Sequence, residues 1–347
     1  MKPSIDVGIL GYGCYVPINR LKAEEIARIW GNEGKLPLDE KAVVSLDEDT
    51  ITISVEASRY ALSRAMIDAK KLGAVYVGTE SKPYAVKPSG TIVAAAIGAS
   101  PNIMTADYEF ACKAGTEAFQ NCIGLIGSGM VDYALAIGAD TAQGRPADAL
   151  EYTAGCGGAA FIFAKKSKET VAYVEASCSH VTDTPDFWRR AHEQYPRHAG
   201  RFTGAPSYYY QITSAAKALM NEVGTEPDDY DYAVFHQPNA YFPVRVGRSL
   251  GFPVEKIKQG LLTPRIGNTY AGSSPMGLAS VLDVANPGEK IFMVSYGSGA
   301  GSDAFSIVVQ PGIVDKRTLA PMTSTLIERK RNIDYAMYTR YRRKIMM

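Results

Sequence analysis

Cys112 has the clearest capacity for chemistry. It lies in the stretch DYEFACKAGTEAFQ, just before a run with the pattern of a helix through about Met130. A cysteine at a helix N-terminus faces unpaired N–H groups and the positive end of the helix dipole, and both favour the thiolate. Because the thiolate is the nucleophilic form, Cys112 is a candidate nucleophile. The alternative is a structural thiol, since free cysteines are among the most buried residues.

The other four cysteines have no comparable setting. An odd number of scattered cysteines argues against a disulfide framework. No C-x-x-C pair and no group of cysteine and histidine has the spacing of a zinc site, so we expect no metal and no cofactor. We interpret these four as structural thiols: Cys14, Cys122, Cys156 and Cys178.

Three further residues stand where strands or turns end. Glu80 closes the apolar run GAVYVGTE, where burial would raise its carboxyl pKa toward that of a general base. His236 closes DYAVFH, where an imidazole can polarise a carbonyl or transfer a proton. Asn268, in the turn GNTYAGSSP, can offer its carboxamide N–H to a substrate carbonyl. The alternatives are a surface glutamate, a core histidine and an ordinary turn asparagine.

The spacing of these residues suggests a duplicated unit. The residue numbers of Glu80 and Cys112 differ by 32, and so do those of His236 and Asn268. Each pair joins a polar residue at a strand end to another at a turn before a helix. In open α/β sheets, ligands lie beyond the carboxyl ends of strands. Two such units around a pseudo-two-fold axis would bring all four side chains to one site.

The elements that must position them alternate along the chain, which indicates an α/β fold. Apolar strands are expected at 73–81, 131–140, 231–239 and 290–310, and helices at 53–70 and 212–224. Two glycine-rich turns, in 155–166 and 297–310, each run into an apolar strand. The second does not match a phosphate-binding loop, and its N–H groups suit an oxyanion hole. We predict an N-terminal half at 1–168, a C-terminal half at 169–312 and a basic extension at 313–347.

Composition excludes several function classes. The 347 residues carry a net charge of +1, which gives no electrostatic argument for binding nucleic acid or a membrane surface. No apolar run is long enough to span a bilayer, and the first residues have the pattern of a strand, so we expect a cytoplasmic protein. From Asp315 onward, nine lysines and arginines face three acids. We interpret this as a solvated extension lying on the protein or on a partner; a nucleic-acid-binding tail is the alternative.

Four local strings, EFACKAGT, FHQPN, GNTYAGSSP and YGSGAGSDAF, make the sequence from about residue 4 to residue 310 resemble the thiolase superfamily. Within it, two families fit. Initiating-type ketoacyl-acyl-carrier-protein synthases use Cys, His and Asn. Hydroxymethylglutaryl-CoA synthases add a glutamate on the preceding strand, which VGTES matches at Glu80. The string ACKAGT and the compact length are most similar to the archaeal form of the latter.

The resemblance implies a thiolase-like fold: two pseudo-symmetric βαβαβαββ halves in an αβαβα layered arrangement. It also implies the condensation of acetyl-CoA with acetoacetyl-CoA and water to 3-hydroxy-3-methylglutaryl-CoA, in the mevalonate pathway of isoprenoid synthesis. Cys112 would carry the acetyl group as a thioester, and Glu80 would remove a methyl proton. His236, helped by Asn268, would polarise or protonate the ketone oxygen.

Five further positions match the family's binding residues. The resemblance places Thr153 and Ser298 at the acyl group, and Arg201, Thr203 and Arg245 at the phosphates and pantetheine of CoA. Arginine suits phosphate because it bonds in a bidentate manner, although a surface ion pair is the alternative for each. The resemblance further implies a homodimer, and a complex with acetoacetyl-CoA thiolase and a small OB-fold scaffold protein.

Two alternatives to this function remain. An initiating-type ketoacyl-acyl-carrier-protein synthase would share three of the four residues but has no use for Glu80. A non-catalytic thiolase-like scaffold subunit would need none of the four. The intact set argues for the condensing enzyme.

Overall fold

The strands form one nine-stranded sheet and two small ones. The structure, a computed structural model, describes residues 1–141 and 144–343, apart from the side chain of Arg201. In spatial order the large sheet consists of β11 (Tyr232–Phe235), β12 (Lys290–Val294), β13 (Gly301–Val309), β8 (Ala172–Val181), β1 (Val7–Tyr15), β7 (Gly157–Lys165), β6 (Tyr133–Asp140), β4 (Ala74–Gly78) and β5 (Met104–Tyr108).

The two halves of this sheet repeat one strand order. Starting from the centre, the first half runs β1, β7, β6, β4, β5 and the second runs β8, β13, β12, β11. The directions match as well, because β4 is parallel to β6 as β11 is to β12, and the other shared neighbours are antiparallel. A short antiparallel pairing of β1 with β8 joins the halves.

The fold class predicted from the sequence is confirmed, with one strand fewer than the repeat suggests. In the described part of the second half, no strand corresponds to β5. The chain there forms two short helices instead, α8 (Val254–Ile257) and η5 (Lys258–Gly260). The predicted boundary after residue 168 falls in the connection between β7 and β8.

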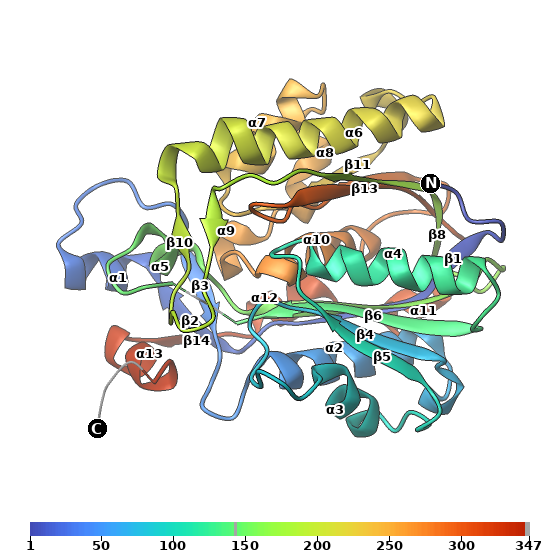
Figure 1. Cartoon of the computed structure of the whole chain (residues 1–347), viewed down its shortest axis with the longest axis horizontal. Coiled ribbons are helices and arrows are strands. Elements are labelled where there is room, and N and C mark those ends of the chain that lie inside the picture. Colours follow the sequence, from blue (N-terminus) through green and yellow to red (C-terminus); the bar gives the residue numbers. More distant parts are fainter. Residues whose placement is uncertain (142–143, 344–347) are drawn as a thin grey trace.

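Five layers are visible in Figure 1. Helices α4 and α10 lie between the two halves of the sheet, with α2 and α3 outside the first half and α6 and α7 outside the second. All ten residues of α10 are buried, as expected for a helix in the middle of a protein. The bounds are α4 (Ala114–Gly127), α10 (Ser273–Leu282), α2 (Thr50–Ala65), α3 (Ser89–Ala96), α6 (Tyr210–Val223) and α7 (Tyr241–Ser249).

Aromatic packing fixes the central layer against both sheets. The ring of Phe119 on α4 lies 4.9 Å from that of Phe161 on β7 and 6.1 Å from that of Phe305 on β13, measured between centroids. Edge-on contacts of this kind add to the free energy of burial. One side chain of the central helix thus connects the two halves of the core.

The C-terminal extension is packed rather than solvated over its described part. Its strand β14 (Arg331–Ile333) runs parallel to β2 (Asn19–Lys22), which pairs with β3 (Glu40–Val43). Tyr338, on its last helix, is buried. The extension therefore lies on the protein, as expected, and forms part of its core. Its helices are α11 (Ile313–Lys316), η7 (Arg317–Leu319), α12 (Thr323–Glu328) and α13 (Tyr335–Tyr341).

The remaining elements are short and connect the strands and helices described above. Among the described residues, no helix has both the length and the apolar character needed to cross a membrane. These elements are α1 (Ala23–Trp30), η1 (Ala69–Lys71), α5 (Ala149–Thr153), β9 (Phe187–Trp188), β10 (Arg197–His198), η2 (Gly200–Phe202), η3 (Thr203–Tyr209), η4 (Pro227–Asp229), α9 (Thr263–Ile266) and η6 (Tyr270–Gly272).

Candidate active site

Cys112 and Glu80 are in direct contact. Glu80 follows strand β4 by two residues, and Cys112 precedes helix α4 by two residues. The Cys112 thiol donates a hydrogen bond to Glu80 Oε1, with the sulfur and the oxygen 3.3 Å apart. The first of the two predicted pairs therefore meets, although the residues are far apart in the sequence.

The backbone at Cys112, the candidate nucleophile, is strained. Ala111, immediately before Cys112, has φ of 45°, which is uncommon for a residue with a side chain. The N–H of Lys113 closes the turn by donating to the carbonyl of Phe110 at 3.1 Å. This turn ends the extended chain abruptly and leaves the Cys112 side chain facing Glu80.

Burial changes the titration of this pair. It raises the pKa of Glu80 to about 8, and the nearby charge of Asp140 adds to the effect. It also raises the pKa of the Cys112 thiol well above its usual range, with a further contribution from Glu80. The expectation that the helix N-terminus makes Cys112 a thiolate is therefore wrong for the free enzyme. Cys112 lies outside the helix next to a carboxyl group, and its burial disfavours the charged form.

Asp140, at the end of β6, was not identified from the sequence. Its Oδ1 accepts hydrogen bonds from the hydroxyl of Thr79, the N–H of Glu80 and the hydroxyl of Ser81, and its Oδ2 accepts from the N–H of Ala271. One buried carboxylate thus holds the Glu80 loop of the first half against the Asn268 loop of the second. The only sequence signal was an acidic residue at the end of an apolar strand.

Asn268 is held by backbone groups on three sides. Its N–H donates to the carbonyl of Thr153 at 2.7 Å, and its carbonyl accepts from the N–H of Gly155 at 2.8 Å. Its side-chain Oδ1 accepts from the N–H of Tyr270 at 2.9 Å, which leaves the side-chain amide nitrogen as a donor. Thr153, predicted at the acyl group, therefore lies beside Asn268. A Cβ on Gly115, three residues after Cys112, would lie 2.4 Å from the carbonyl oxygen of Ala271, so the Asn268 loop packs against the start of helix α4.

His236 is buried between aromatic rings at the end of β11. Its ring lies 5.9 Å from that of Tyr296 and 6.4 Å from that of Tyr208, between centroids. Among the described residues, its Nδ1 has no hydrogen-bond partner. Burial lowers the pKa of His236 to about 3. The imidazole is therefore neutral at physiological pH and able to polarise a carbonyl through a hydrogen bond.

A cavity of about 210 Å³ opens above the nucleophile turn. Glu80 and the predicted binding residue Ser298 both line it, together with Ala111. The hairpin of β9 and β10 supplies Trp188 and Arg189 to the same cavity. These two were missed from the sequence, because the stretch DFWRR has no strand or helix pattern that would direct it to the site.

The residues predicted to bind CoA lie farther out. Thr203 begins η3, and the guanidinium of Arg245, on α7, stacks over the ring of Tyr209, the last residue of η3, at 5.0 Å. Arg245 is exposed to solvent. The backbone of Arg201 belongs to η2, but its side chain lies outside the described structure. In the described ranges, no group of three or more His, Cys, Asp or Glu could hold a metal ion.

The fold and this arrangement of residues define the class. A five-layered αβαβα protein built from two halves of the same strand order, with a cysteine before the central helix of the first half, has a thiolase-like fold. A family model described as 3-oxoacyl-[acyl-carrier-protein] synthase III C terminal matches residues 220–309. A solved 3-oxoacyl-(acyl carrier protein) synthase III from Pseudomonas aeruginosa is similar with a TM-score of 0.78 and 20% identity, covering 88% of this chain and 98% of its own.

Sequence comparison narrows the class to one family. Hydroxymethylglutaryl-CoA synthase of Thermococcus onnurineus is 63% identical over 100% of this chain and 99% of its own length. Hydroxymethylglutaryl-CoA synthase of Methanocaldococcus jannaschii is 58% identical over 98% of this chain and 99% of its own length. A crystal structure of a hydroxymethylglutaryl-CoA synthase with CoA has a TM-score of 0.87 at 21% identity, covering 97% of this chain and 90% of its own. The chain belongs to the hydroxymethylglutaryl-CoA synthase family, as the resemblance indicated.

Proposed function

We propose that this chain condenses acetyl-CoA with acetoacetyl-CoA and water to 3-hydroxy-3-methylglutaryl-CoA and CoA, in the mevalonate pathway. The contact between the Cys112 thiol and Glu80 Oε1 carries the proposal at the level of residues. It pairs a nucleophile with a base, and the family membership supplies the substrates. An initiating-type ketoacyl-acyl-carrier-protein synthase would have no use for the glutamate.

The first step is acetyl transfer to the enzyme. The Cys112 sulfur attacks the acetyl carbonyl of acetyl-CoA, the bond from that carbonyl to the CoA sulfur breaks, and the thiol proton passes to the departing CoA. Because burial keeps the free thiol protonated, its proton must leave as the sulfur attacks, and it ends on the departing CoA sulfur. Backbone N–H groups of the nucleophile turn and of the Ser298 turn stabilise the oxyanion.

The second step forms the carbon–carbon bond. Glu80, as a carboxylate, removes a methyl proton from the acetyl group on Cys112, and the resulting carbanion attacks the ketone of acetoacetyl-CoA. A pKa of about 8 makes Glu80 a stronger base than an ordinary glutamate, while a fraction remains ionised at neutral pH. Neutral His236 polarises the ketone oxygen, the Asn268 amide assists, and the alkoxide that forms takes up the proton that Glu80 removed. Water then cleaves the thioester and releases the product from Cys112.

Substrate binding uses both halves of the molecule. Thr153 and Ser298 contact the acyl portion, while Arg201, Thr203 and Arg245 hold the phosphates and pantetheine of CoA. The exposed position of Arg245 supports this assignment. We further propose a cytoplasmic homodimer that works with acetoacetyl-CoA thiolase and a small OB-fold scaffold protein, with no bound cofactor.

Labelled acetyl-CoA tests the function directly. The protein is incubated with it, with and without acetoacetyl-CoA, and mass spectrometry locates the adduct and identifies the released product. We expect an acetyl group on Cys112 that is released as 3-hydroxy-3-methylglutaryl-CoA only when acetoacetyl-CoA is present. Condensation that needs an acyl carrier protein and releases carbon dioxide would identify the initiating type. A lack of any adduct and of any product would favour the scaffold subunit.

A further inference from the structure

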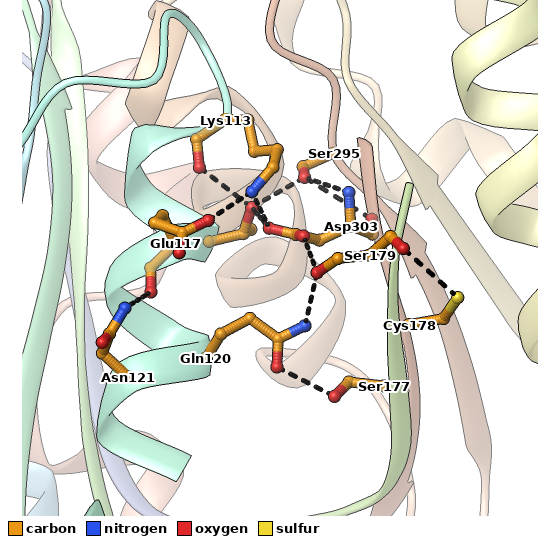
Figure 2. A network of polar contacts seen from close by, with 10 residues as sticks. Lys113, Glu117, Gln120, Asn121, Ser177, Cys178, Ser179, Ser295 and Asp303 are labelled. Atoms are coloured by element: carbon orange, nitrogen blue, oxygen red, sulfur yellow. Dashed lines mark hydrogen bonds and ion pairs between the residues drawn. The ribbon is translucent and has the colours of Figure 1, made fainter. Parts of the chain in front are cut away.

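A buried ion pair lies directly behind the nucleophile. Lys113 follows Cys112 in the sequence, and its Nζ is 3.0 Å from Oδ2 of Asp303. The side chains are 1% and 0% exposed. Figure 2 shows the lysine of the α4 turn pointing across to the strand that carries Asp303. The pair therefore crosses from the N-terminal half to the C-terminal half.

The carboxylate is fully engaged. Its Oδ2 also accepts from the hydroxyl of Thr116 at 2.7 Å, and its Oδ1 accepts from the hydroxyl of Ser179 at 2.6 Å. Lys113 has a second carboxylate partner in Glu117 and lies over the ring of Phe110. A buried charge pair with this many hydrogen bonds is rigid, because any movement leaves a charge without a partner.

Asp303 belongs to the hairpin that carries Ser298. Its carbonyl and its N–H bond to the backbone and the side chain of Ser295, and Gly297 bonds to Gly301 across the turn. Gly297 touches the nucleophile turn so closely that a Cβ there would lie 2.5 Å from the carbonyl oxygen of Phe110. The ion pair thus fixes the base of one turn to the other turn, and both turns line the cavity above Glu80.

The equivalent place in the other half has no ion pair. Asn268 corresponds to Cys112 in spacing, so Thr269 corresponds to Lys113. Ala159 lies two residues before Phe161, as Asp303 lies two residues before Phe305. The contact between the turn and the facing strand therefore contains a salt bridge at Lys113 and Asp303, whereas the equivalent contact in the other half contains only uncharged residues, Thr269 and Ala159. The fold does not need the charges, and a buried ion pair is in general a poor source of stability.

We propose that Lys113 and Asp303 are positioning residues that hold the strained Cys112 turn at the distance from the Ser298 turn that acetyl transfer requires. The pair touches neither substrate nor the sulfur, and acts through the backbone of Phe110, Ala111 and Gly297. The proposal rests on the proposed function in that it assumes Cys112 becomes acetylated. Its role is confined to the placement of the nucleophile, and it supplies no proton.

The test measures acetylation of Cys112 in a single turnover, by quenching with acid and quantifying the adduct by mass spectrometry. Asp303→Asn and Lys113→Met are each compared with wild type over a range of acetyl-CoA concentrations. We expect the acetylation rate at saturating acetyl-CoA to fall at least about tenfold, because small misplacements of a reacting group are costly. The acetyl-CoA concentration for half-maximal rate should change less than about twofold, since binding contacts are untouched. Lys113→Arg, which keeps the charge, should recover part of the rate.

Asp283→Asn is a matched control. Asp283 is also a buried carboxylate facing a buried cation, Arg64, at 3.5 Å, and it contacts none of the proposed site residues. We expect its thermal unfolding midpoint to fall as much as that of Asp303→Asn while its acetylation rate stays at the wild-type value. Equal slowing in both variants would show that the Lys113–Asp303 pair matters only through stability, and would overturn the proposal.

The double variant Lys113→Met/Asp303→Asn covers the case in which the single variants do not fold. It has no unpaired buried charge, so we expect it to be more stable than either single variant and still slow in acetylation. Wild-type acetylation by the folded double variant would refute the positioning role. If the wild-type protein itself acquires no acetyl group on Cys112, the proposed function fails instead, and the two failures are thereby distinguished.

Discussion

The Cys112 turn and the Asn268 turn occupy equivalent places in the two halves but are held in different ways. Backbone hydrogen bonds to Thr153 and Gly155 fix Asn268. Both turns contain a residue with a side chain at positive φ, Ala111 at 45° and Tyr270 at 49°, but only the Cys112 turn has the buried ion pair of Lys113 and Asp303 behind it. In the proposed mechanism the Asn268 amide only donates a hydrogen bond, whereas the Cys112 sulfur must form and break a covalent bond. The two turns thus share a strained backbone and differ in the buried ion pair, which among the described residues lies only behind the Cys112 turn.

Removal of the proposed nucleophile in the N-terminal half should have the largest effect on the reaction rate. We expect Cys112→Ala to lower the overall rate by about 10⁴-fold or more, because the covalent step has no substitute. Acetyl-CoA should still bind, since the binding residues lie elsewhere. Steady-state kinetics and mass spectrometry measure the two effects. A variant that retains more than a few per cent of the wild-type rate would mean that Cys112 is not the nucleophile.

Glu80 is the next test, and it separates the two chemical steps. We expect Glu80→Ala to keep acetylation of Cys112 but to slow condensation by about 10²- to 10⁴-fold, as is typical for a lost general base. Trapping the acetyl-enzyme and then adding acetoacetyl-CoA measures each step separately. Survival of both steps at the wild-type rate would show that the role assigned to Glu80 is wrong.

The pH profile of condensation follows from the same group. Glu80 acts as a carboxylate, and burial raises its pKa to about 8, so the rate should rise up to about pH 8 and then level off. The free energy of unfolding depends on pH in the opposite direction to the rate. A carboxyl group whose pKa is raised on folding binds its proton more tightly in the folded state. The contribution of Glu80 to the free energy of unfolding therefore falls as the pH rises from the pKa of the unfolded chain toward 8. Glu80→Gln should raise the thermal unfolding midpoint at pH 8 and leave it nearly unchanged at pH 4. A flat pH profile would contradict this assignment.

Strand ends and turns were readable from the sequence, whereas the contacts between halves were not. Alternating strands and helices predicted the fold class, and the equal spacings predicted that Glu80 would meet Cys112. Asp140 was missed because its four donors come from segments more than a hundred residues apart in sequence. The thiolate expectation for Cys112 was wrong because burial and the facing Glu80 are tertiary effects. The catalytic roles of all four residues stay predictions until variants are measured.

For the Asn268 turn, we expect Asn268→Ala to slow condensation less than the loss of Glu80 does. We expect condensation to slow by about 10²-fold, a common cost of losing one oxyanion donor, while acetylation of Cys112 changes little. Asn268→Asp is a more specific test, since it keeps the side-chain oxygen that accepts from the Tyr270 N–H and removes the amide N–H donor. If Asn268→Asp condenses as fast as wild type, the side chain only shapes the turn.

The smallest effect on condensation is expected from a change in the C-terminal extension, at a residue that contacts the segment beside the Asn268 turn. Glu151, two residues before Thr153, is buried and accepts hydrogen bonds from the Tyr335 hydroxyl at 2.9 Å and from the Trp30 indole N–H at 3.0 Å. Tyr335→Phe removes one of these donors, which should cost about 1 kcal/mol in the free energy of unfolding. Condensation should fall by less than about threefold, because the backbone bond between Asn268 and Thr153 remains.

Tyr341→Phe, on the same helix, is the control for Tyr335→Phe in chemical denaturation and steady-state assays. Tyr341 is only partly buried and packs against the buried apolar cluster that contains Tyr335 and Tyr338. Among the described residues, its hydroxyl makes no side-chain hydrogen bond. A loss of stability confined to Tyr335→Phe would show that the extension acts on the site through Glu151. A large loss of activity without any loss of stability would show instead that the Asn268 turn depends on the extension as closely as the Cys112 turn depends on its ion pair, and the contrast between the two halves would disappear.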